Sequence, residues 1–179
     1  SGSSRGLGDV YKRQTEYYVE DTIELIENSC QKDFKGYKGC YKDFLKHEPY
    51  NLSVKEIIER SSNVGTIIAT KDLNINDLEE FLSKFGFSKR TGIELSGESK
   101  GSFDPNKTCT TCLSSLSIGY SINVTQMQMV KAYSIIANGG KNVDLTLIKS
   151  PYSNYSPNQV IDSNSSQRLK NLLINVVEG

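Results

Sequence analysis

The amphipathic pattern over residues 53–71 is interrupted by three small polar residues, Ser61, Ser62 and Asn63. Apolar residues at helical spacing precede the interruption and others follow it, which predicts two consecutive helices. Serine and asparagine side chains bond readily to nearby backbone groups and therefore favour turns and helix ends. The chain is thus expected to turn at this S-x-N triplet, where the side chains of Ser61 and Asn63 can be aimed at one point.

Three further segments are predicted to be helical, because each repeats apolar residues at helical spacing. They span residues 76–85, 124–138 and 164–177. Local signals mark several helix ends. Ser53 with Glu56, and Thr125 with Gln128, have the three-residue spacing of a capping box. Gly86 is expected to end the helix over 76–85 in the left-handed conformation.

Strands are expected to be short and few. Residues 15–50 are polar, aromatic and interrupted by glycine, which indicates short strands or extended loops. Residues 90–95 are interpreted as a turn and a strand, 97–107 as a loop, and 144–163 as a loop with one or two strands. Together these patterns predict an α+β fold in which helices dominate.

Length and charge limit the possible functions. The chain has 179 residues, a net charge of zero and a pI near 6.6, so a nucleic-acid-binding domain, with its basic face, is not expected. No apolar run is long enough for a membrane span. Residues 1–14 lack hydrophobic periodicity and resemble translated adaptor sequence, so we interpret them as non-native, with a disordered natural terminus as the alternative. One domain is expected over residues 15–179.

The four cysteines leave more than one interpretation open. Cys109 and Cys112 have the close spacing of a zinc-binding pair, but Cys30 and Cys40 are too far apart for a usual second pair. In an oxidising compartment Cys30 and Cys40 could join a hairpin by a disulfide, and free buried thiols are equally compatible with the sequence. No metal is assigned on this basis.

Several blocks in fixed order resemble the transpeptidase domain of class B, division-type penicillin-binding proteins. They begin with the residues that precede the triplet, continue through it and end at Gly140. The matching blocks are Tyr41–Asp43 with His47, Tyr50 and 52–54, then 59–66, 85–87, 91–93, 97–98, 117–125 with Gln128, 132–133 and 137–140. The resemblance covers roughly residues 41–179. It implies the penicillin-recognising α+β fold, helix-rich here and truncated at both ends, and a serine D,D-transpeptidase that cross-links peptidoglycan through an acyl-enzyme.

The resemblance also implies roles for individual residues. Ser61 and Asn63 match the second catalytic motif, S-x-N, of the three motifs S-x-x-K, S-x-N and K-T-G. A hydroxyl at Ser61 can both donate and accept, so it can relay a proton, and the Asn63 amide can donate to a substrate carbonyl. Gly119 and Tyr120 match a loop that borders the substrate groove. Ser121 replaces a glycine of that loop, which puts the loop geometry in doubt.

The other two catalytic motifs are not matched convincingly. Residues 29–32 fit the letters S-x-x-K, but Ser29 is too close to Ser61 and lacks the Pro-Gly that precedes the nucleophile in the family. The chain also ends before a K-T-G. We therefore expect a central fragment that is inactive alone. A catalytic histidine would need a nucleophile and an orienting acid, and His47, the only histidine, stands alone in a polar loop, so it is interpreted as structural.

The same resemblance implies a substrate, inhibitors, partners and a cellular location for the protein. Substrate and inhibitor are a D-alanyl-D-alanine stem peptide and β-lactams, with no cofactor, metal or nucleic acid, and division or elongation proteins are expected partners. The location is the extracytoplasmic side of the membrane, anchored by a segment outside this chain. Two alternatives remain: a non-catalytic penicillin-binding or β-lactam sensor domain, and a thiol- or metal-dependent interaction domain.

Overall fold

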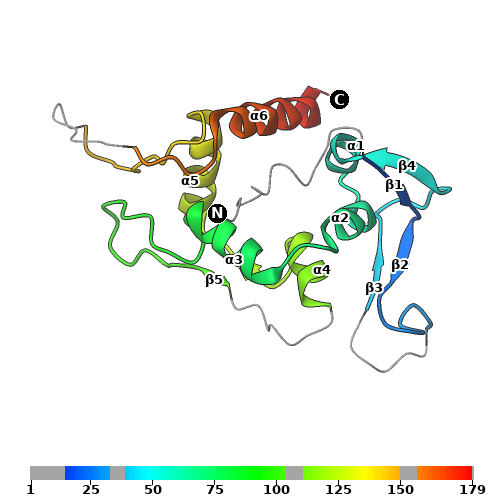
Figure 1. Cartoon of the computed structure of the whole chain (residues 1–179). Coiled ribbons are helices and arrows are strands. Elements are labelled where there is room, and N and C mark those ends of the chain that lie inside the picture. Colours follow the sequence, from blue (N-terminus) through cyan, green and yellow to red (C-terminus); the bar gives the residue numbers. More distant parts are fainter. Residues whose placement is uncertain (1–14, 33–38, 104–110, 150–156, 179) are drawn as a thin grey trace, which may run out of the picture. The chain divides into compact units, whose positions relative to one another are not determined.

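The computed structural model describes residues 15–32, 39–103, 111–149 and 157–178. The interpretation of residues 1–14 lies outside these ranges. The first four elements along the chain are strands, most of the later ones are helices, and the paired strands are antiparallel (Figure 1). The α+β prediction is therefore confirmed. Two compact units can be distinguished and are described separately. Of the described residues, the first unit holds 15–72, 111–120 and 175–178, and the second holds 73–103, 121–149 and 157–174.

Three short strands in the first unit confirm the expectation for residues 15–50, and a fourth runs beyond that span, from Tyr50 to Ser53. They form two antiparallel pairs, β1 (Glu16–Val19) with β4 (Tyr50–Ser53) and β2 (Thr22–Glu24) with β3 (Cys40–Lys42). A disulfide joins Cys30 to Cys40 at the start of β3. Cys112 is disulfide-bonded as well, so the free-thiol interpretation is wrong for these three cysteines. These thiols are therefore not available as metal ligands.

The two helices predicted around the S-x-N triplet are confirmed as α1 (Val54–Glu59) and α2 (Asn63–Thr70). The capping box at the start of α1 is also confirmed. Ser53 Oγ accepts from the Glu56 amide at 3.3 Å, and the Ser53 amide donates to Glu56 Oε2 at 2.9 Å. These two bonds satisfy amide groups that the first turn of a helix leaves without partners.

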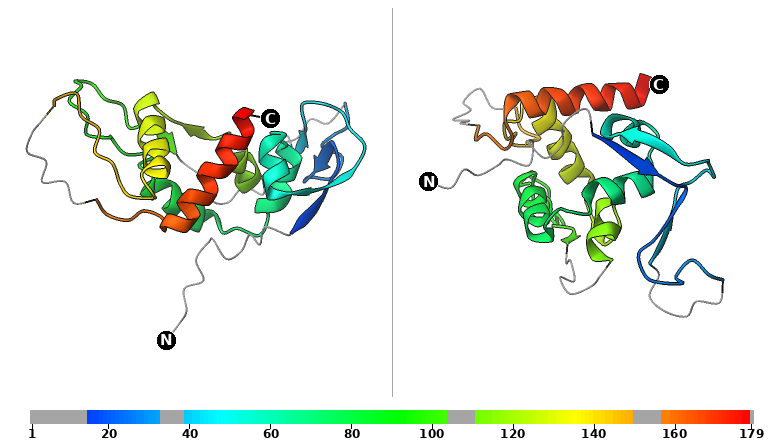
Figure 2. Two further views of the ribbon diagram at one scale, coloured as in Figure 1. Left: turned by 90° about the horizontal axis from the view of Figure 1, so that it is seen from above. Right: turned by 45° about the vertical axis from the view of Figure 1, so that its right-hand side comes forward.

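The core of the first unit fixes both helices against the strands. Val19, Leu52, Ile57 and Val64 are each at most 3 % exposed and form one cluster. Burying a side chain of this size stabilises the fold by about 1.5–3 kcal/mol. Gly65 allows the close approach of α1 and α2, because a Cβ at this position would lie 2.8 Å from Ile57 Cγ1. The S-x-N triplet therefore connects two helices whose relative placement is set by packing (Figure 2).

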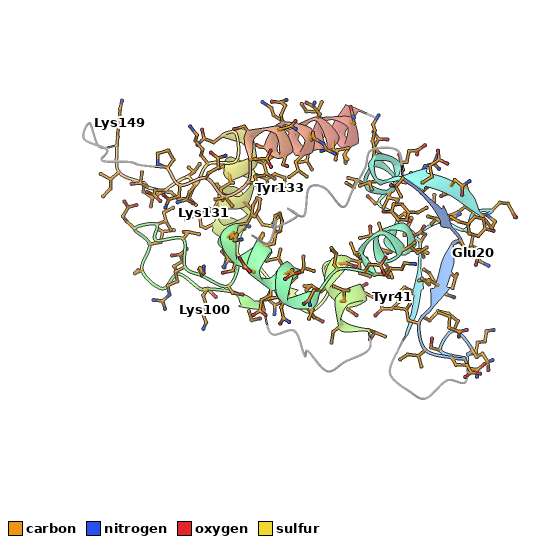
Figure 3. The ribbon with its side chains drawn as sticks, in the orientation of Figure 1. Glu20, Tyr41, Lys100, Lys131, Tyr133 and Lys149 are labelled. Atoms are coloured by element: carbon orange, nitrogen blue, oxygen red, sulfur yellow. A yellow bond between two sulfur atoms is a disulfide. The ribbon has the colours of Figure 1, made fainter. Side chains whose placement is uncertain are left out.

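A short helix that the sequence analysis did not predict, α4 (Cys112–Ser117), packs against α2 in the same unit. Its six residues give too little periodicity for recognition, and Thr111 makes no side-chain cap. Tyr41 of β3 points toward α4, and its hydroxyl lies 2.7 Å from Ser115 Oγ (Figure 3). Leu116 of α4 is buried. The tyrosine therefore ties β3 to α4.

The second unit is built mainly from helices, as the sequence predicted. Its elements are α3 (Ile75–Lys84), the antiparallel pair of β5 (Ser102–Phe103) and β6 (Ile122–Asn123), α5 (Gln126–Ala137), and α6 (Ser163–Glu178) up to residue 174. Phe85, Ala132 and Ile135 form its buried cluster. The buried Ser166 hydroxyl donates to the Ile136 carbonyl at 2.6 Å and thereby joins α6 to α5.

The capping box of α5 and the glycine cap of α3 are confirmed. Thr125 Oγ1 accepts from the Gln128 amide at 3.2 Å, and the Thr125 amide donates to Gln128 Oε1 at 2.9 Å. Gly86 has a φ of 95° directly after Phe85, the C-cap residue of α3. The predicted start of α3 was too late, because the Asn74 side chain accepts from the Asn76 amide and caps the helix earlier.

The strand predicted over residues 90–95 is wrong. The Thr91 and Gly92 amides donate to the carboxylate of Glu98, at 2.7 and 3.1 Å, instead of to a neighbouring strand. In the described part of 144–163 the strand prediction is met only by an isolated bridge between Lys141 and Gln159. Within the described ranges, none of the helices has the length and apolar character that crossing a membrane requires.

Candidate active site

The S-x-N triplet lies where α1 ends and α2 begins. The Ser61 amide donates to the Ile58 carbonyl at 3.1 Å, and the Ser62 amide donates to the Ile57 carbonyl at 3.0 Å. This pair of bonds is the Schellman arrangement, in which the residue after the helix cap adopts a left-handed conformation. Ser61 has that conformation, with a φ of 53°. The triplet therefore makes a turn fixed by backbone bonds at the end of α1.

Ser61 stands at a backbone position that glycine would fill at lower cost. A non-glycine residue in the left-handed region is strained by about 1 kcal/mol or more, and such strain clusters at functional sites. The Ser61 side chain is exposed, and within the described ranges its hydroxyl has no hydrogen-bond partner. Structural demands alone thus give no reason for a serine here, whereas a free hydroxyl is available for chemistry.

Ser62, the middle residue of the triplet, performs the helix cap. It is 3 % exposed, and its Oγ accepts from the Gly65 amide at 2.8 Å. The same hydroxyl donates to Asp43 Oδ2 at 2.7 Å. Helix capping was the structural interpretation available for Ser61 and Asn63. The cap falls instead on Ser62, which a sequence signal could have indicated, since it stands three residues before Gly65 in the first turn of α2.

Asn63 is the first residue of α2, and its side-chain amide donates to the Lys42 carbonyl at 3.2 Å. An amide nitrogen carries two hydrogens, so this bond orients the group and leaves the second hydrogen and Oδ1 for another partner. Ser61 and Asn63 are thus brought into one turn, as the sequence predicted. Their catalytic roles remain predictions.

Gly119 and Tyr120 end α4 with the same kind of turn. The Gly119 amide donates to the Leu116 carbonyl and the Tyr120 amide to the Ser115 carbonyl, both at 2.9 Å. Gly119 has a φ of 87°, and the tyrosine side chain is 65 % exposed. Within the described ranges, no hydrogen bond or ring contact joins Tyr120 to Ser61 or Asn63, although all three lie in the first unit. Their assignment to a groove remains a prediction.

The backbone conformation of Ser121 shows how this loop accommodates a serine in place of the family's glycine. Ser121 has a φ of 64°, so it adopts the left-handed conformation that glycine would take more easily. The substitution therefore adds strain and a side chain without removing the turn.

His47 joins the residues that surround the triplet. Its Nε2 lies 3.1 Å from Asp43 Oδ2, and its Nδ1 lies 2.9 Å from the Glu48 carbonyl oxygen. The imidazole ring of His47 stacks on the ring of Tyr50, with centroids 4.3 Å apart. The guanidinium carbon of Arg60 lies 4.9 Å from the centroid of the Tyr50 ring. Both ring nitrogens face acceptors, so only the doubly protonated ring satisfies both. The Glu48 carbonyl, and then the carboxylate of Asp43, raise the pKa of His47 above 6.5 against the opposing effect of burial.

We expect this histidine to make the free energy of unfolding depend on pH near neutrality. Because its folded pKa is raised, the stability it contributes is fully present below its unfolded pKa of about 6.5 and is lost as pH rises through the folded value. Urea unfolding of the chain between about pH 5 and 8 should therefore show a decline that His47→Gln abolishes. No other histidine is present to produce it. An identical pH profile for both proteins would contradict the assignment.

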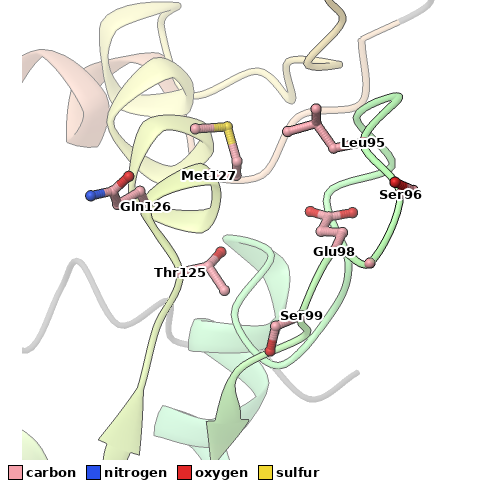
Figure 4. A pocket seen from close by; sticks show the side chains of 8 residues that line it. Leu95, Ser96, Glu98, Ser99, Thr125, Gln126 and Met127 are labelled. Carbon is pink, nitrogen blue, oxygen red and sulfur yellow. The ribbon is translucent and has the colours of Figure 1, made fainter.

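An open hollow of about 320 Å³ lies in the second unit between residues 95–99 and the start of α5 (Figure 4). It is lined by Leu95, Ser96, Gly97, Glu98, Ser99, Thr125, Gln126 and Met127. The pKa of Glu98 is lowered by hydrogen bonds to its carboxylate. The largest effect comes from the Thr91 hydroxyl, and the Thr91 and Gly92 amides add to it. That carboxylate is therefore already occupied in holding the loop, and the hollow offers no pair of acid and base for catalysis.

Ser29, the serine that fits the letters S-x-x-K, does not have the features of a nucleophile. Its hydroxyl is buried and has no hydrogen-bond partner among the described residues, so no base is placed to activate it. The next residue, Cys30, is held in the disulfide. Across the described ranges, no group of three or more potential metal ligands is present.

The sequence pattern of the family described as "Penicillin binding protein transpeptidase domain" matches residues 20–179. The chain belongs to this transpeptidase family. Penicillin-binding protein PbpB of Mycolicibacterium smegmatis is 33% identical over 110 residues, which are 61% of this chain and 17% of that protein. Peptidoglycan D,D-transpeptidase FtsI of Buchnera aphidicola is 34% identical over 109 residues, 60% of this chain and 19% of that protein.

A solved structure confirms the fold of this transpeptidase family member. A peptidoglycan synthetase from Bifidobacterium adolescentis superposes with a TM-score of 0.78 and 25% identity, covering 95% of this chain and 31% of that one. The chain thus spans less than a fifth of the two curated relatives and about a third of the solved structure. The alternative of a thiol- or metal-dependent interaction domain is set aside by the family membership.

Proposed function

We propose that the chain is part of a peptidoglycan D,D-transpeptidase domain and supplies its S-x-N motif. The observation that carries this proposal is that the two serines of the triplet have different roles. Ser62 caps α2, whereas Ser61 keeps an unbonded hydroxyl in a strained left-handed turn. A position that tolerates strain to hold a free hydroxyl is typical of a functional residue.

In the proposed reaction, Ser61 relays a proton between the nucleophilic serine and the leaving group, because a hydroxyl can accept and donate in the same step. Asn63 donates its free amide hydrogen to the carbonyl of a stem peptide ending in D-alanyl-D-alanine, or to that of a β-lactam. Gly119 and Tyr120 border the groove in which the peptide lies. The nucleophile, its lysine and the K-T-G strand are supplied by other parts of the complete domain.

The proposed site of action is the extracytoplasmic face of the membrane, held there by an anchor outside these residues. The disulfide between Cys30 and Cys40 supports a compartment of this kind, since disulfides persist in oxidising surroundings and are rare in the cytosol. Proteins of division or elongation are proposed as partners.

Labelling with a fluorescent penicillin tests the proposal. A complete domain that contains these residues should be acylated, and the 179-residue chain alone should not be, because catalytic groups of this kind act as a unit. Labelling of the bare chain at Ser29 would show that the active site is placed wrongly. Failure of the complete domain to bind penicillin would favour a non-catalytic relative, and binding without turnover of a stem peptide would favour a sensor.

A further inference from the structure

We infer that Asp43 is a positioning residue for the S-x-N motif, and that it acts through the backbone and side chains at the start of α2. The inference rests on the proposed function, because it concerns the same motif. It adds a residue that lies in a different part of the sequence and that neither the motif nor the sequence analysis assigned.

The Asp43 carboxylate meets the triplet at two points. Its Oδ1 accepts from the Val64 amide at 2.9 Å, and its Oδ2 accepts from the Ser62 hydroxyl at 2.7 Å. These groups stand immediately before and after Asn63. Since the Asp43 side chain is only 7% exposed, water cannot easily replace either bond.

The backbone beside Asp43 completes the arrangement. The Lys42 carbonyl accepts from the Asn63 side-chain amide at 3.2 Å. Two consecutive residues thus hold the Ser62 side chain, the Asn63 side chain and the Val64 backbone amide. A carboxylate at the start of a helix is also favoured electrostatically, because the unpaired amides there carry partial positive charge. Charge and geometry therefore act in the same direction.

Two contacts hold Asp43 itself, and a disulfide holds the strand that leads to it. Its amide donates to the Asp21 carbonyl at 2.9 Å, directly beyond the pairing of Thr22 with Lys42 in the β2–β3 hairpin. His47 contacts Oδ2 at 3.1 Å. The Cys30–Cys40 disulfide joins the other end of β3 to the segment after β2. A rigid strand end thus presents the carboxylate to the helix start.

The left-handed conformation of Ser61 is strained, so it must be held in place by the residues that follow. A left-handed serine can relax toward an ordinary conformation unless the residues that follow are held in place. Releasing the start of α2 would let Ser61 and Asn63 shift relative to each other, and a displacement of about 1 Å in a catalytic group can cost 10²-fold in rate. Asp43 prevents that shift without touching the substrate.

The test measures acylation of a complete domain by penicillin, separating the binding constant from the acylation rate constant. We expect Asp43→Ala to lower the rate constant by about 10- to 100-fold with a smaller change in binding. Asp43→Asn keeps an acceptor for the Val64 amide but faces the Ser62 hydroxyl with a donor, so an intermediate loss is expected. The exposed Asp72→Asn serves as the matched control and should change nothing.

A double-mutant cycle separates positioning from general destabilisation. In an Asn63→Ala background, Asp43→Asn should cause little further loss, because the group it positions is gone. Additive losses, or losses that merely follow the unfolded fraction measured by thermal melting, would overturn the inference. Hydrogen exchange of the Val64 amide in the isolated chain gives a readout independent of activity, and it should accelerate in Asp43→Ala, which removes the acceptor of that amide. If Ser61 and Asn63 themselves prove dispensable for acylation, the proposed function fails instead.

Discussion

Replacing Ser61 or Asn63 with alanine in a complete domain should lower the rate constant of acylation by penicillin about 10²–10³-fold. Ser61→Ala removes the hydroxyl that relays the proton, and Asn63→Ala removes the amide that holds the substrate carbonyl. Neither side chain is part of the buried core, so folding should be nearly unaffected. Stopped-flow measurement with a labelled penicillin gives the acylation rate constant of each variant.

A glycine at position 61 separates chemistry from structure more sharply than alanine does. Ser61→Gly should raise the free energy of unfolding by about 1 kcal/mol, because the φ of 53° suits glycine, while acylation falls as far as in Ser61→Ala. Asn76→Ala, in the first turn of α3 with an exposed side chain, is the control for Asn63. A faster or unchanged acylation in Ser61→Gly would mean that the triplet is only a turn.

Gln128→Ala should destabilise the chain by about 3 kcal/mol, the largest effect on folding that we expect from one polar side chain. Gln128 is fully buried, and its Nε2 donates to the carbonyls of Lys89 and Lys100 at 2.8 and 2.7 Å. Its Oε1 accepts from the Thr125 amide. Alanine would leave these backbone groups unpaired in the interior, and each such group costs about 1–3 kcal/mol before any relaxation or water entry.

Two variants make this prediction specific. Gln126→Ala changes an exposed glutamine on the same helix and should stay within about 0.5 kcal/mol of the wild type. Gln128→Glu should be at least as harmful as alanine, because a carboxylate cannot donate to two carbonyls. Urea unfolding followed by circular dichroism measures all three. Equal stability of Gln128→Ala and Gln126→Ala would show that the buried bonds contribute little.

Much of the secondary structure was predictable because its signals are local. The capping boxes at Ser53 and Thr125, and the glycine cap at Gly86, involve residues within a few positions of each other, and the structure has all three. Helical periodicity likewise depends on side chains three and four residues apart. The strand expected at residues 90–95 is absent because the side chain of Glu98, seven residues after Thr91, takes amides that a neighbouring strand would need.

By itself, the sequence determined the fold class, the described helices other than α4, and the turn that holds Ser61 and Asn63, because short-range bonds and periodicity depend on neighbouring residues. Only the tertiary structure decided that Ser62 caps the helix and that Asp43, 19 residues earlier, holds it. The pairing of Cys30 with Cys40 and the contact of Tyr41 with Ser115, 74 residues away, were decided in the same way. Such contacts depend on how the core brings distant segments together, and no local pattern records that.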